Sequence, residues 1–373
     1  MLPRHLYVHV PFCARRCVYC DFSIAVRRGI PVDAYVAGIE RELDLRRFAA
    51  QPLELDTLYF GGGTPSRLGA DGIARLVDTI RQHVALAPDA EVTIEANPED
   101  VTPSATAAWR AAGVNRLSLG AQSFDDRILR WMHRTHDSVG IARAVDAARA
   151  SGIDNISLDL IFALPKELER AWDADLSRAL ALSPQHISLY GLTIEPHTPL
   201  GRAHHRGQFA ESPDERYERE FLQAHDVLTA AGFEHYEVSN YGLPGRASRH
   251  NSAYWSGAAY AGIGPSAHGY DGCTRRWNRS AYVDWLEAVH ADSDPLEGQE
   301  ALTAENRAAE VVYLGLRTAN GLVMEHGDLA HVTPWIGAGW AAIAEGEQLV
   351  LTASGWLRLD ALAADLTVVR SRY

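Results

Sequence analysis

The sequence YVHVPFCARRCVYCDF, Tyr7–Phe22, places three cysteines within eight residues, directly after a short β-branched run. The run Leu6–Val10 is predicted to be a strand, and the segment after it a loop. Such a loop folds three thiolates, those of Cys13, Cys17 and Cys20, around a single metal centre. A structural zinc site normally has four protein ligands, whereas an iron-sulfur cluster held by three cysteines leaves one iron open. The three-cysteine set therefore favours a cluster with an open iron.

Two other interpretations of these cysteines remain open. One is a zinc ion completed by His9 or Cys273, and the other is three core cysteines without a ligand. A disulfide framework is not expected, because bridges between such close neighbours are strained and constrain little chain. The cysteines therefore fit a reducing compartment.

The composition is that of an ordinary globular protein, with 47% hydrophobic and 22% charged residues among 373. The formal net charge of −13 repels phosphate backbones, so we expect no nucleic-acid partner. We find no apolar run of signal-peptide length at the start and no stretch of about 18 apolar residues later. We expect a cytoplasmic protein without an integral membrane segment, and peripheral attachment to a membrane stays open.

Short β-branched and aromatic runs alternate with segments of helical spacing, as in a parallel sheet with crossover helices. The six predicted strands are Leu6–Val10, Leu58–Phe60, Val92–Glu95, Arg116–Gly120, Ile156–Phe162 and His186–Leu192. Six units are too few for an eight-stranded barrel, so we predict an α/β fold with a partial (β/α)6 barrel. In such a sheet the chemistry gathers at the loops leaving the C-terminal ends of the strands.

A change of pattern in the second half of the chain predicts a further region. The sequence becomes irregular and rich in glycine and aromatic residues, which is typical of loops. Helical segments then lead to QLVLTASGWLRL, 348–359, predicted to be a hairpin turning at Ser354 and Gly355 with a short helix after it. We therefore predict a core domain over 1–241 and, over 242–373, a smaller helical region with a winged-helix-like module.

DNA reading by this module is not expected. Residues 301–373 carry five Arg and no Lys against eight Asp and Glu. Such a surface lacks the basic footprint of a nucleic-acid-binding domain.

Polar residues at successive strand ends mark a candidate pocket near the cysteines. The glycines of GGGTP, 61–65, allow a ligand to approach the backbone N–H groups closely. Glu95, Gln122 and Asp159 each stand at or near the end of an otherwise apolar run. A buried polar side chain needs a partner, so each is either satisfied by a neighbour or directed at a ligand. Taken singly, each is better explained by a neighbour.

The Cys-x3-Cys-x2-Cys spacing, with an aromatic residue before the last cysteine, resembles the signature of the radical S-adenosylmethionine (SAM) superfamily. The resemblance implies a [4Fe-4S] cluster whose open iron is chelated by the amino and carboxylate groups of SAM. In that family an electron from the reduced cluster cleaves SAM to methionine and a 5′-deoxyadenosyl radical. The resemblance also implies a SAM pocket in which Arg134 faces the SAM carboxylate. The residues it assigns to this pocket are Tyr7, Tyr19, Gly63, Thr64, Glu95, Gln122, Arg134 and Asp159.

Motifs along nearly the whole chain, GGGTP, GAQSF, DLIFALP and LYGLTIEPHTPL, resemble the oxygen-independent coproporphyrinogen oxidase branch. True oxidases of this branch carry a fourth cysteine two positions after the last cluster cysteine and a longer N-terminal extension. Here Phe22 stands at that position, and only twelve residues precede Cys13. These departures, together with RHNSAYW at 249–255, make the chain similar to the HemW-type heme chaperones.

The resemblance to HemW-type chaperones implies heme binding through the HNxxYW motif. Its residues in this chain are His250, Asn251, Tyr254 and Trp255. Imidazole is a ligand of heme iron, and aromatic side chains pack against porphyrins. An ordered loop contact explains a histidine beside aromatic residues equally simply, and that alternative stays open. His268 in GIGPSAHG is a second candidate ligand.

The same resemblance implies a heme chaperone that passes heme to an acceptor apo-hemoprotein of the respiratory chain. It also implies a one-electron donor, such as a flavodoxin, that reduces the cluster. The alternative is an enzyme, an oxygen-independent coproporphyrinogen III oxidase, in which the deoxyadenosyl radical drives oxidative decarboxylation of propionate side chains.

Overall fold

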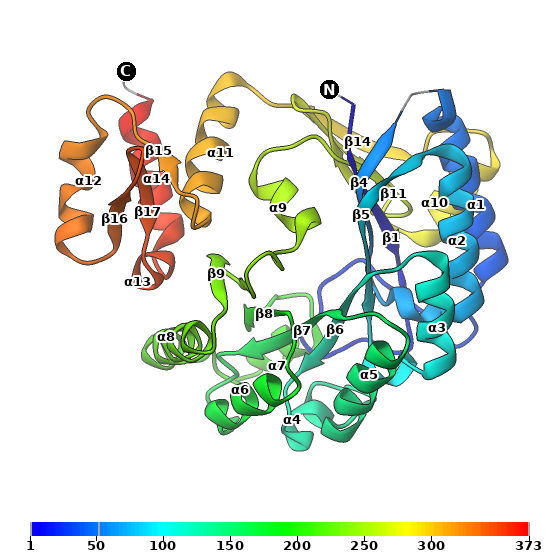
Figure 1. Ribbon diagram of the computed structural model, residues 1–373, viewed down its shortest axis with the longest axis horizontal. Coiled ribbons are helices and arrows are strands. Elements are labelled where there is room, and N and C mark those ends of the chain that lie inside the picture. Colours follow the sequence, from blue (N-terminus) through cyan, green and yellow to red (C-terminus); the bar gives the residue numbers. More distant parts are fainter. Residues whose placement is uncertain (1, 51–52, 372–373) are drawn as a thin grey trace.

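In the computed structural model, which describes residues 2–50 and 53–371, a nine-stranded sheet forms the body of the protein (Figure 1). Seven neighbouring strands, from β11 to β8, run parallel, and two antiparallel strands extend one edge. In spatial order the strands are β11 (Ala261–Ile263), β1 (His5–Val10), β4 (Glu54–Gly62), β5 (Ala85–Ala96), β6 (Arg116–Gln122), β7 (Asn155–Phe162), β8 (His186–Gly191), β10 (Asn240–Gly242) and β9 (Glu234–Glu237). The six strands predicted from the sequence all form, and they are consecutive neighbours in the sheet.

The sheet is curved, with most helices on its outer side and one helix, α9 (Arg249–Trp255), on its inner side (Figure 1). Because strand side chains alternate between faces, Val8 and Val10 of β1 join the core while Tyr7 and His9 face the other way. The outer helices are α1 (Val32–Leu45), α2 (Gly69–His83), α3 (Pro103–Ala112), α5 (Ser138–Ala150), α6 (Trp172–Ala181), α8 (Asp214–Ala230) and α10 (Tyr282–His290). Of the helices in the described ranges, none combines the length and hydropathy needed to cross a membrane.

The connections between these strands and helices carry short elements of their own. They are β2 (Phe12–Cys13) and β3 (Ala25–Val26), α4 (Asp126–Trp131) after β6, α7 (Pro199–His205) after β8, and the 3-10 turns η1 (Phe48–Ala50), η2 (Pro65–Leu68) and η3 (Pro98–Asp100). Strands β2 and β3 pair in parallel and hold the two ends of the cysteine segment together. The segment is thereby fixed beside the C-terminal end of β1.

The segment predicted as loops after residue 241 contains regular structure. The HNxxYW motif forms helix α9, and β11 joins the main sheet beside β1. The strands of a second sheet are β12 (His268–Tyr270), β13 (Thr274–Asn278) and β14 (Leu296–Ala301). Gly262 marks close packing rather than a turn, because a Cβ there would lie 2.0 Å from the His268 carbonyl oxygen. The sheet therefore continues past the boundary predicted at 241/242.

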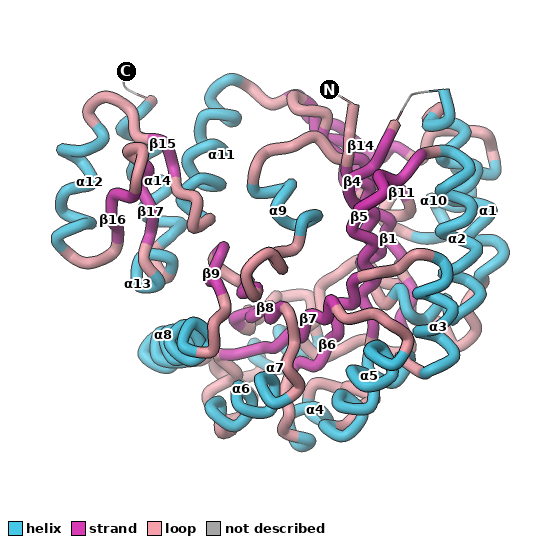
Figure 2. Tube along the Cα trace, in the orientation of Figure 1, coloured by secondary structure: helices cyan, strands magenta, loops and turns pink. Residues whose placement is uncertain are grey.

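A small C-terminal module stands beside the curved sheet (Figures 1 and 2). Its elements are α11 (Ala304–Arg317), β15 (Leu322–Val323), α12 (Asp328–Gly337), β16 (Ala341–Ala344), β17 (Gln348–Leu351), α13 (Ala353–Trp356) and α14 (Leu359–Arg370). Helices around a hairpin match the predicted winged-helix-like arrangement, but the predicted turn is wrong. The hairpin is β16–β17, turning at Gly346 and Glu347, both with positive φ. Ser354 and Gly355 instead lie within α13, where the Gly355 N–H donates to the Thr352 hydroxyl at 3.1 Å.

Candidate functional site

The three cysteines of the motif follow β1 and line one cavity. Cys13 ends β2 and is buried, and its Sγ lies 3.3 Å from the Thr64 hydroxyl oxygen. Cys17 and Cys20 are partly exposed, and the Cys20 N–H donates to the Cys17 carbonyl at 3.4 Å. All four cysteines of the chain are free. Across 2–50 and 53–371, no three His, Cys, Asp or Glu side chains are grouped as ligands of a single metal ion.

A cavity of about 450 Å³ opens beside the three thiols, at the C-terminal ends of β4 to β8. This is the size of a small-molecule binding site. Seven of the eight residues predicted for SAM line it: Tyr19, Gly63, Thr64, Glu95, Gln122, Arg134 and Asp159. The eighth, Tyr7, does not. The parallel strands thus end at one place and bring together residues that are far apart in the sequence.

The glycine turn after β4 forms the floor of this cavity. Gly62 has φ +110°, which side chains rarely allow, and its N–H donates to the Glu95 carboxylate at 3.1 Å. A Cβ on Gly63 would lie 2.7 Å from the Pro11 carbonyl oxygen. Glycine at 63 thus lets β1 and the cysteine segment approach the turn. Replacing Gly63 by Val would displace the segment that carries Cys13, so this variant would not test ligand binding alone.

Two carboxylates face the cavity with raised pKa values. Burial raises the pKa of Glu95 to about 7, against the opposing effect of the Tyr59 hydroxyl, which donates to it at 2.8 Å. Burial likewise raises the pKa of Asp159 to about 6, although Ser118 donates to both of its oxygens at 3.1 and 3.2 Å. Such shifts are frequent where a protein is arranged to receive a ligand.

Arg134 supplies the cation of the cavity. One of its terminal nitrogens, Nη2, donates to the Asn97 side chain at 2.6 Å and to the Gly120 carbonyl at 2.8 Å. The other, Nη1, lies 3.6 Å from the Cys17 sulfur. A guanidinium has five N–H donors, so these three contacts fix its plane and leave donors for a ligand.

Sequence reasoning missed several residues of the cavity wall. Asn97 stands two positions after Glu95, directly after the end of β5, and this spacing was the available signal. Ser118 and Tyr190 also line the cavity, and only the fold brings them there. Gln122, which was predicted, ends β6 in the left-handed region at φ +66°, a conformation that is often found at functional sites.

The HNxxYW motif does not line this cavity and packs against the middle of β4 and β5. The ring of His250 is 1% exposed, and its two nitrogens are hydrogen-bonded to the Thr57 hydroxyl at 2.6 Å and the Tyr254 hydroxyl at 2.8 Å. Burial lowers the pKa of His250 to about 3. The Glu91 carboxylate accepts the backbone N–H groups of Arg249 and His250. This geometry conflicts with the predicted role of His250 as a heme ligand, because neither nitrogen is free.

The other predicted heme residues differ in their placement. Tyr254 and Trp255 line a second cavity of about 400 Å³, and Tyr7 lines it too, with its hydroxyl 3.2 Å from His9 Nδ1. The backbone N–H of Asn251 donates to the Ser248 hydroxyl at the start of α9. Tyr7 therefore belongs to the second cavity rather than to the one beside the cysteines.

Comparison with known proteins gives the family. Residues 7–179 match the Radical SAM superfamily. The protein named heme chaperone HemW in Mycobacterium tuberculosis is 38% identical over 378 residues, covering 98% of this chain and 95% of that protein. Its namesake in Escherichia coli is 41% identical, covering 72% of this chain and 70% of that protein. The solved structure of coproporphyrinogen III oxidase (HemN) from Escherichia coli superposes with a TM-score of 0.84, covering 98% of this chain and 90% of that chain, and at 23% identity it shows the fold alone. This chain belongs to the HemW family of radical SAM proteins.

Proposed function

We propose that this protein is a cytoplasmic heme chaperone that carries a [4Fe-4S] cluster on Cys13, Cys17 and Cys20 and binds SAM in the adjoining cavity. The observation that carries the proposal is the convergence of three free thiols on a 450 Å³ cavity lined by the carboxylates of Glu95 and Asp159. Family membership implies the cluster and SAM, and the donor set fits both. The name of the relatives supports heme as the cargo.

Within the SAM cavity the residues have separate roles. Gly63 and Thr64 hold the amino group of SAM, and Arg134 holds its carboxylate with the N–H groups that Asn97 and Gly120 leave free. Glu95 offers a carboxylate oxygen to a polar or cationic part of SAM. The remaining predicted residues, Tyr19, Gln122 and Asp159, complete the wall. A reduced cluster held by the three cysteines would supply a one-electron donor beside the bound SAM.

Glu95→Gln is expected to weaken SAM binding about tenfold at pH 8, or about 1.4 kcal/mol, because a charge-assisted contact is lost. SAM is cationic at its sulfonium, so it binds better to the ionised carboxylate. With the Glu95 pKa at about 7, affinity in the parent rises with pH up to neutrality and levels off above it. In Glu95→Gln this rise is lost.

Calorimetric titration with SAM at pH 6, 7 and 8 measures the effect in reconstituted protein. Glu40→Gln, which removes an exposed carboxylate from α1, is the matched control and keeps the parental profile. Parental affinity and pH profile in Glu95→Gln would refute the role given to this carboxylate.

The arginines around the cysteine loop support an acidic one-electron donor as a partner. Residues 14–28 carry four Arg and one Asp in a chain of net charge −13, and all four arginines are exposed. The Arg27 guanidinium lies 5.5 Å over the Tyr282 ring, a contact that leaves its charge uncancelled. Phe22 and Val26 are exposed between these charges, by 61% and 52%. An apolar centre with a basic rim suits a transient complex with an acidic protein such as a flavodoxin.

Arg27→Glu/Arg28→Glu is expected to slow reduction of the cluster by a flavodoxin about tenfold or more at low ionic strength, because rim charges act mainly on the association rate. The control variant Arg143→Glu/Arg219→Glu makes the same charge change on α5 and α8. A photoreduced deazaflavin, which needs no docking surface, should reduce all three proteins at one rate. Equal flavodoxin rates in the two double variants would contradict the docking site.

The transfer of heme to an acceptor apo-hemoprotein of the respiratory chain completes the proposal. The oxidase alternative requires its reacting carbon to be held close to the deoxyadenosyl carbon. Phe22, at the position of the oxidase's fourth cysteine, is 61% exposed at the rim of the SAM cavity. Separate additions of heme and coproporphyrinogen III to the reconstituted protein test the proposal, because a chaperone binds the first and leaves the second unchanged.

A further inference from the structure

Tyr59 of β4 contacts both the SAM cavity and helix α9. Its hydroxyl donates to Glu95 Oε1 at 2.8 Å, and its ring stacks on the ring of His250 with centroids 4.9 Å apart. We infer that Tyr59 is a positioning residue, through which helix α9 sets the orientation and charge of the Glu95 carboxylate and thereby the binding of SAM. The inference rests on the proposed role of Glu95 in SAM binding, and it gives His250 a role other than heme ligation.

The first glycine of GGGTP makes room for the contact between Tyr59 and Glu95. Gly61 and Tyr59 stand two positions apart on β4, so they face the same side of the sheet. A Cβ on Gly61 would lie 2.9 Å from the Tyr59 ring, 2.9 Å from the Tyr7 ring and 3.1 Å from the Glu95 carboxylate. The backbone at Gly61 continues strand β4, so glycine is required there for space rather than for a turn.

Neighbouring rings fix the Tyr59 side chain, which is buried. Tyr7, its partner in β1, stacks on it with centroids 6.1 Å apart, in addition to the contact with His250. His250 is itself held by the hydroxyls of Thr57 and Tyr254. Close packing of this kind leaves a side chain little rotational freedom, so the Tyr59 hydroxyl is presented to Glu95 in one position.

Other groups face Glu95 without holding it. The charged and titratable side chains around its carboxylate, besides Tyr59, are Asp159 of β7, Arg116 of β6, Tyr190 of β8, Tyr7 of β1 and Tyr254 of α9. Among the side chains of residues 2–50 and 53–371, Tyr59 alone donates a hydrogen bond to Glu95, and the Gly62 N–H donates to the second oxygen. Both contacts favour the ionised carboxylate and oppose the effect of burial on its pKa. Loss of the Tyr59 hydroxyl therefore raises the pKa of Glu95 above its value of about 7.

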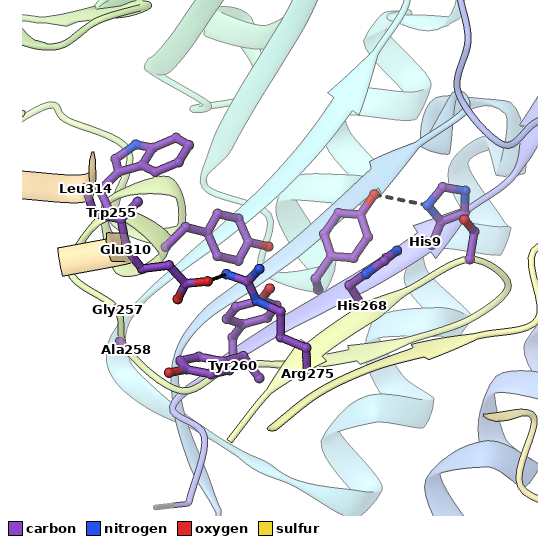
Figure 3. Close-up of a pocket in the computed structure, with 13 residues that line it drawn as sticks. His9, Trp255, Gly257, Ala258, Tyr260, His268, Arg275, Glu310 and Leu314 are labelled. Atoms are coloured by element: carbon purple, nitrogen blue, oxygen red, sulfur yellow. Dashed lines mark hydrogen bonds and ion pairs between the residues drawn. The ribbon is translucent and has the colours of Figure 1, made fainter. Parts of the chain in front are cut away.

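Helix α9 also borders the second cavity, so the contact through Tyr59 joins the two cavities. Trp255 lines the second cavity together with Leu314 and Glu310 of α11 (Figure 3). Tyr254 lines it too and is hydrogen-bonded to His250 at 2.8 Å. A displacement of α9 at the second cavity is therefore transmitted to Glu95 through His250 and Tyr59.

Infrared spectra of the SAM-free, anaerobically reconstituted protein measure the ionisation of Glu95, read as the carboxyl absorption that Glu95→Gln lacks. The midpoint of this titration should rise by about one pH unit in Tyr59→Phe, because the lost hydrogen bond is to a charged group. His250→Ala, which removes the stacked ring, should raise it too. His250→Phe, which keeps a ring against Tyr59, should return it close to the parental midpoint.

Calorimetric titration with SAM tests the consequence for binding. At pH 7 the affinity of Tyr59→Phe should fall about fivefold, because the ionised fraction of Glu95 falls from about a half to about a tenth, and at about pH 9 it should approach the parental value. Tyr241→Phe is the matched control and should behave as the parent in both measurements. It removes a buried hydroxyl that has no hydrogen-bond partner among the described residues.

Three outcomes would overturn the inference, and they are distinguishable. An unchanged carboxyl titration in Tyr59→Phe would exclude Tyr59 as the positioning residue, whatever the SAM affinity. A shifted titration in Tyr59→Phe with a parental one in His250→Ala would exclude the link to α9. A shifted titration with parental SAM affinity at pH 7 would refute the role of Glu95 in SAM binding, on which the inference rests.

Discussion

Cys17→Ser is expected to remove nearly all cluster iron from the reconstituted protein. Thiolate is the iron ligand, and a serine hydroxyl stays protonated at neutral pH and substitutes poorly for it. Cys17 is more informative than the buried Cys13 because it is partly exposed, so its replacement disturbs little packing. Cys13→Ser and Cys20→Ser should lose the cluster too.

Iron content and the broad visible absorption of the reconstituted variants measure this result. Cys273→Ser is the matched control, since Cys273 is exposed in the turn between β12 and β13. This variant should have the same iron content as the parent. That result would also exclude a zinc site in which Cys273 is the fourth ligand. Normal iron in Cys17→Ser would refute the cluster assignment.

His250→Ala is expected to lower the free energy of unfolding by about 3 kcal/mol, within the range for emptying a buried site that also holds hydrogen bonds. The substitution removes a ring that stacks on Tyr59 with centroids 4.9 Å apart. It also leaves the hydroxyls of Thr57 and Tyr254 without their partner. Helix α9 then loses its side-chain contact with β4 but keeps its backbone hydrogen bonds to Glu91 of β5.

Urea unfolding of the cluster-free protein measures the loss, with His290→Ala expected within about 0.5 kcal/mol of the parent. The free energy of unfolding of the parent is expected to decrease as the pH falls. The folded pKa of His250, about 3, lies below its ordinary value of 6.5, so the unfolded chain binds the proton more tightly. The stability that neutral, buried His250 contributes is therefore complete above pH 6.5 and is lost as the pH falls toward 3. Parental stability with lost heme binding in His250→Ala would instead make His250 the ligand.

The cysteine loop and the strand-end residues could be predicted because local pattern determines them. The apolar runs predicted the strands. Parallel strands present their C-terminal ends to one site, and this rule predicted that Glu95, Gln122 and Asp159 lie together. Tyr7 was assigned to the SAM pocket because it flanks the cysteines in the sequence, and not by this rule. Its position in the middle of β1 turns its ring toward the second cavity.

Long-range packing explains what the sequence could not predict. The motif around His250 was expected to be a loop, yet it is a helix, which Ser248 caps and whose first N–H groups donate to Glu91 of β5. Gly355 was expected to form a hairpin turn. A Cβ there would lie 1.9 Å from the Trp340 carbonyl oxygen, so glycine at this position allows α13 to pack closely against the backbone at Trp340. Neither Glu91 nor Trp340 is close in the sequence to the residue that it contacts.

The most direct measurement of the central claim offers the anaerobically reconstituted protein two compounds separately. Heme is titrated into one sample, and coproporphyrinogen III is added to another with SAM and a low-potential reductant. We expect heme to bind, and we expect coproporphyrinogen III to remain without decarboxylation. Decarboxylated product, or the absence of heme binding, would contradict the assignment of this protein as a heme chaperone.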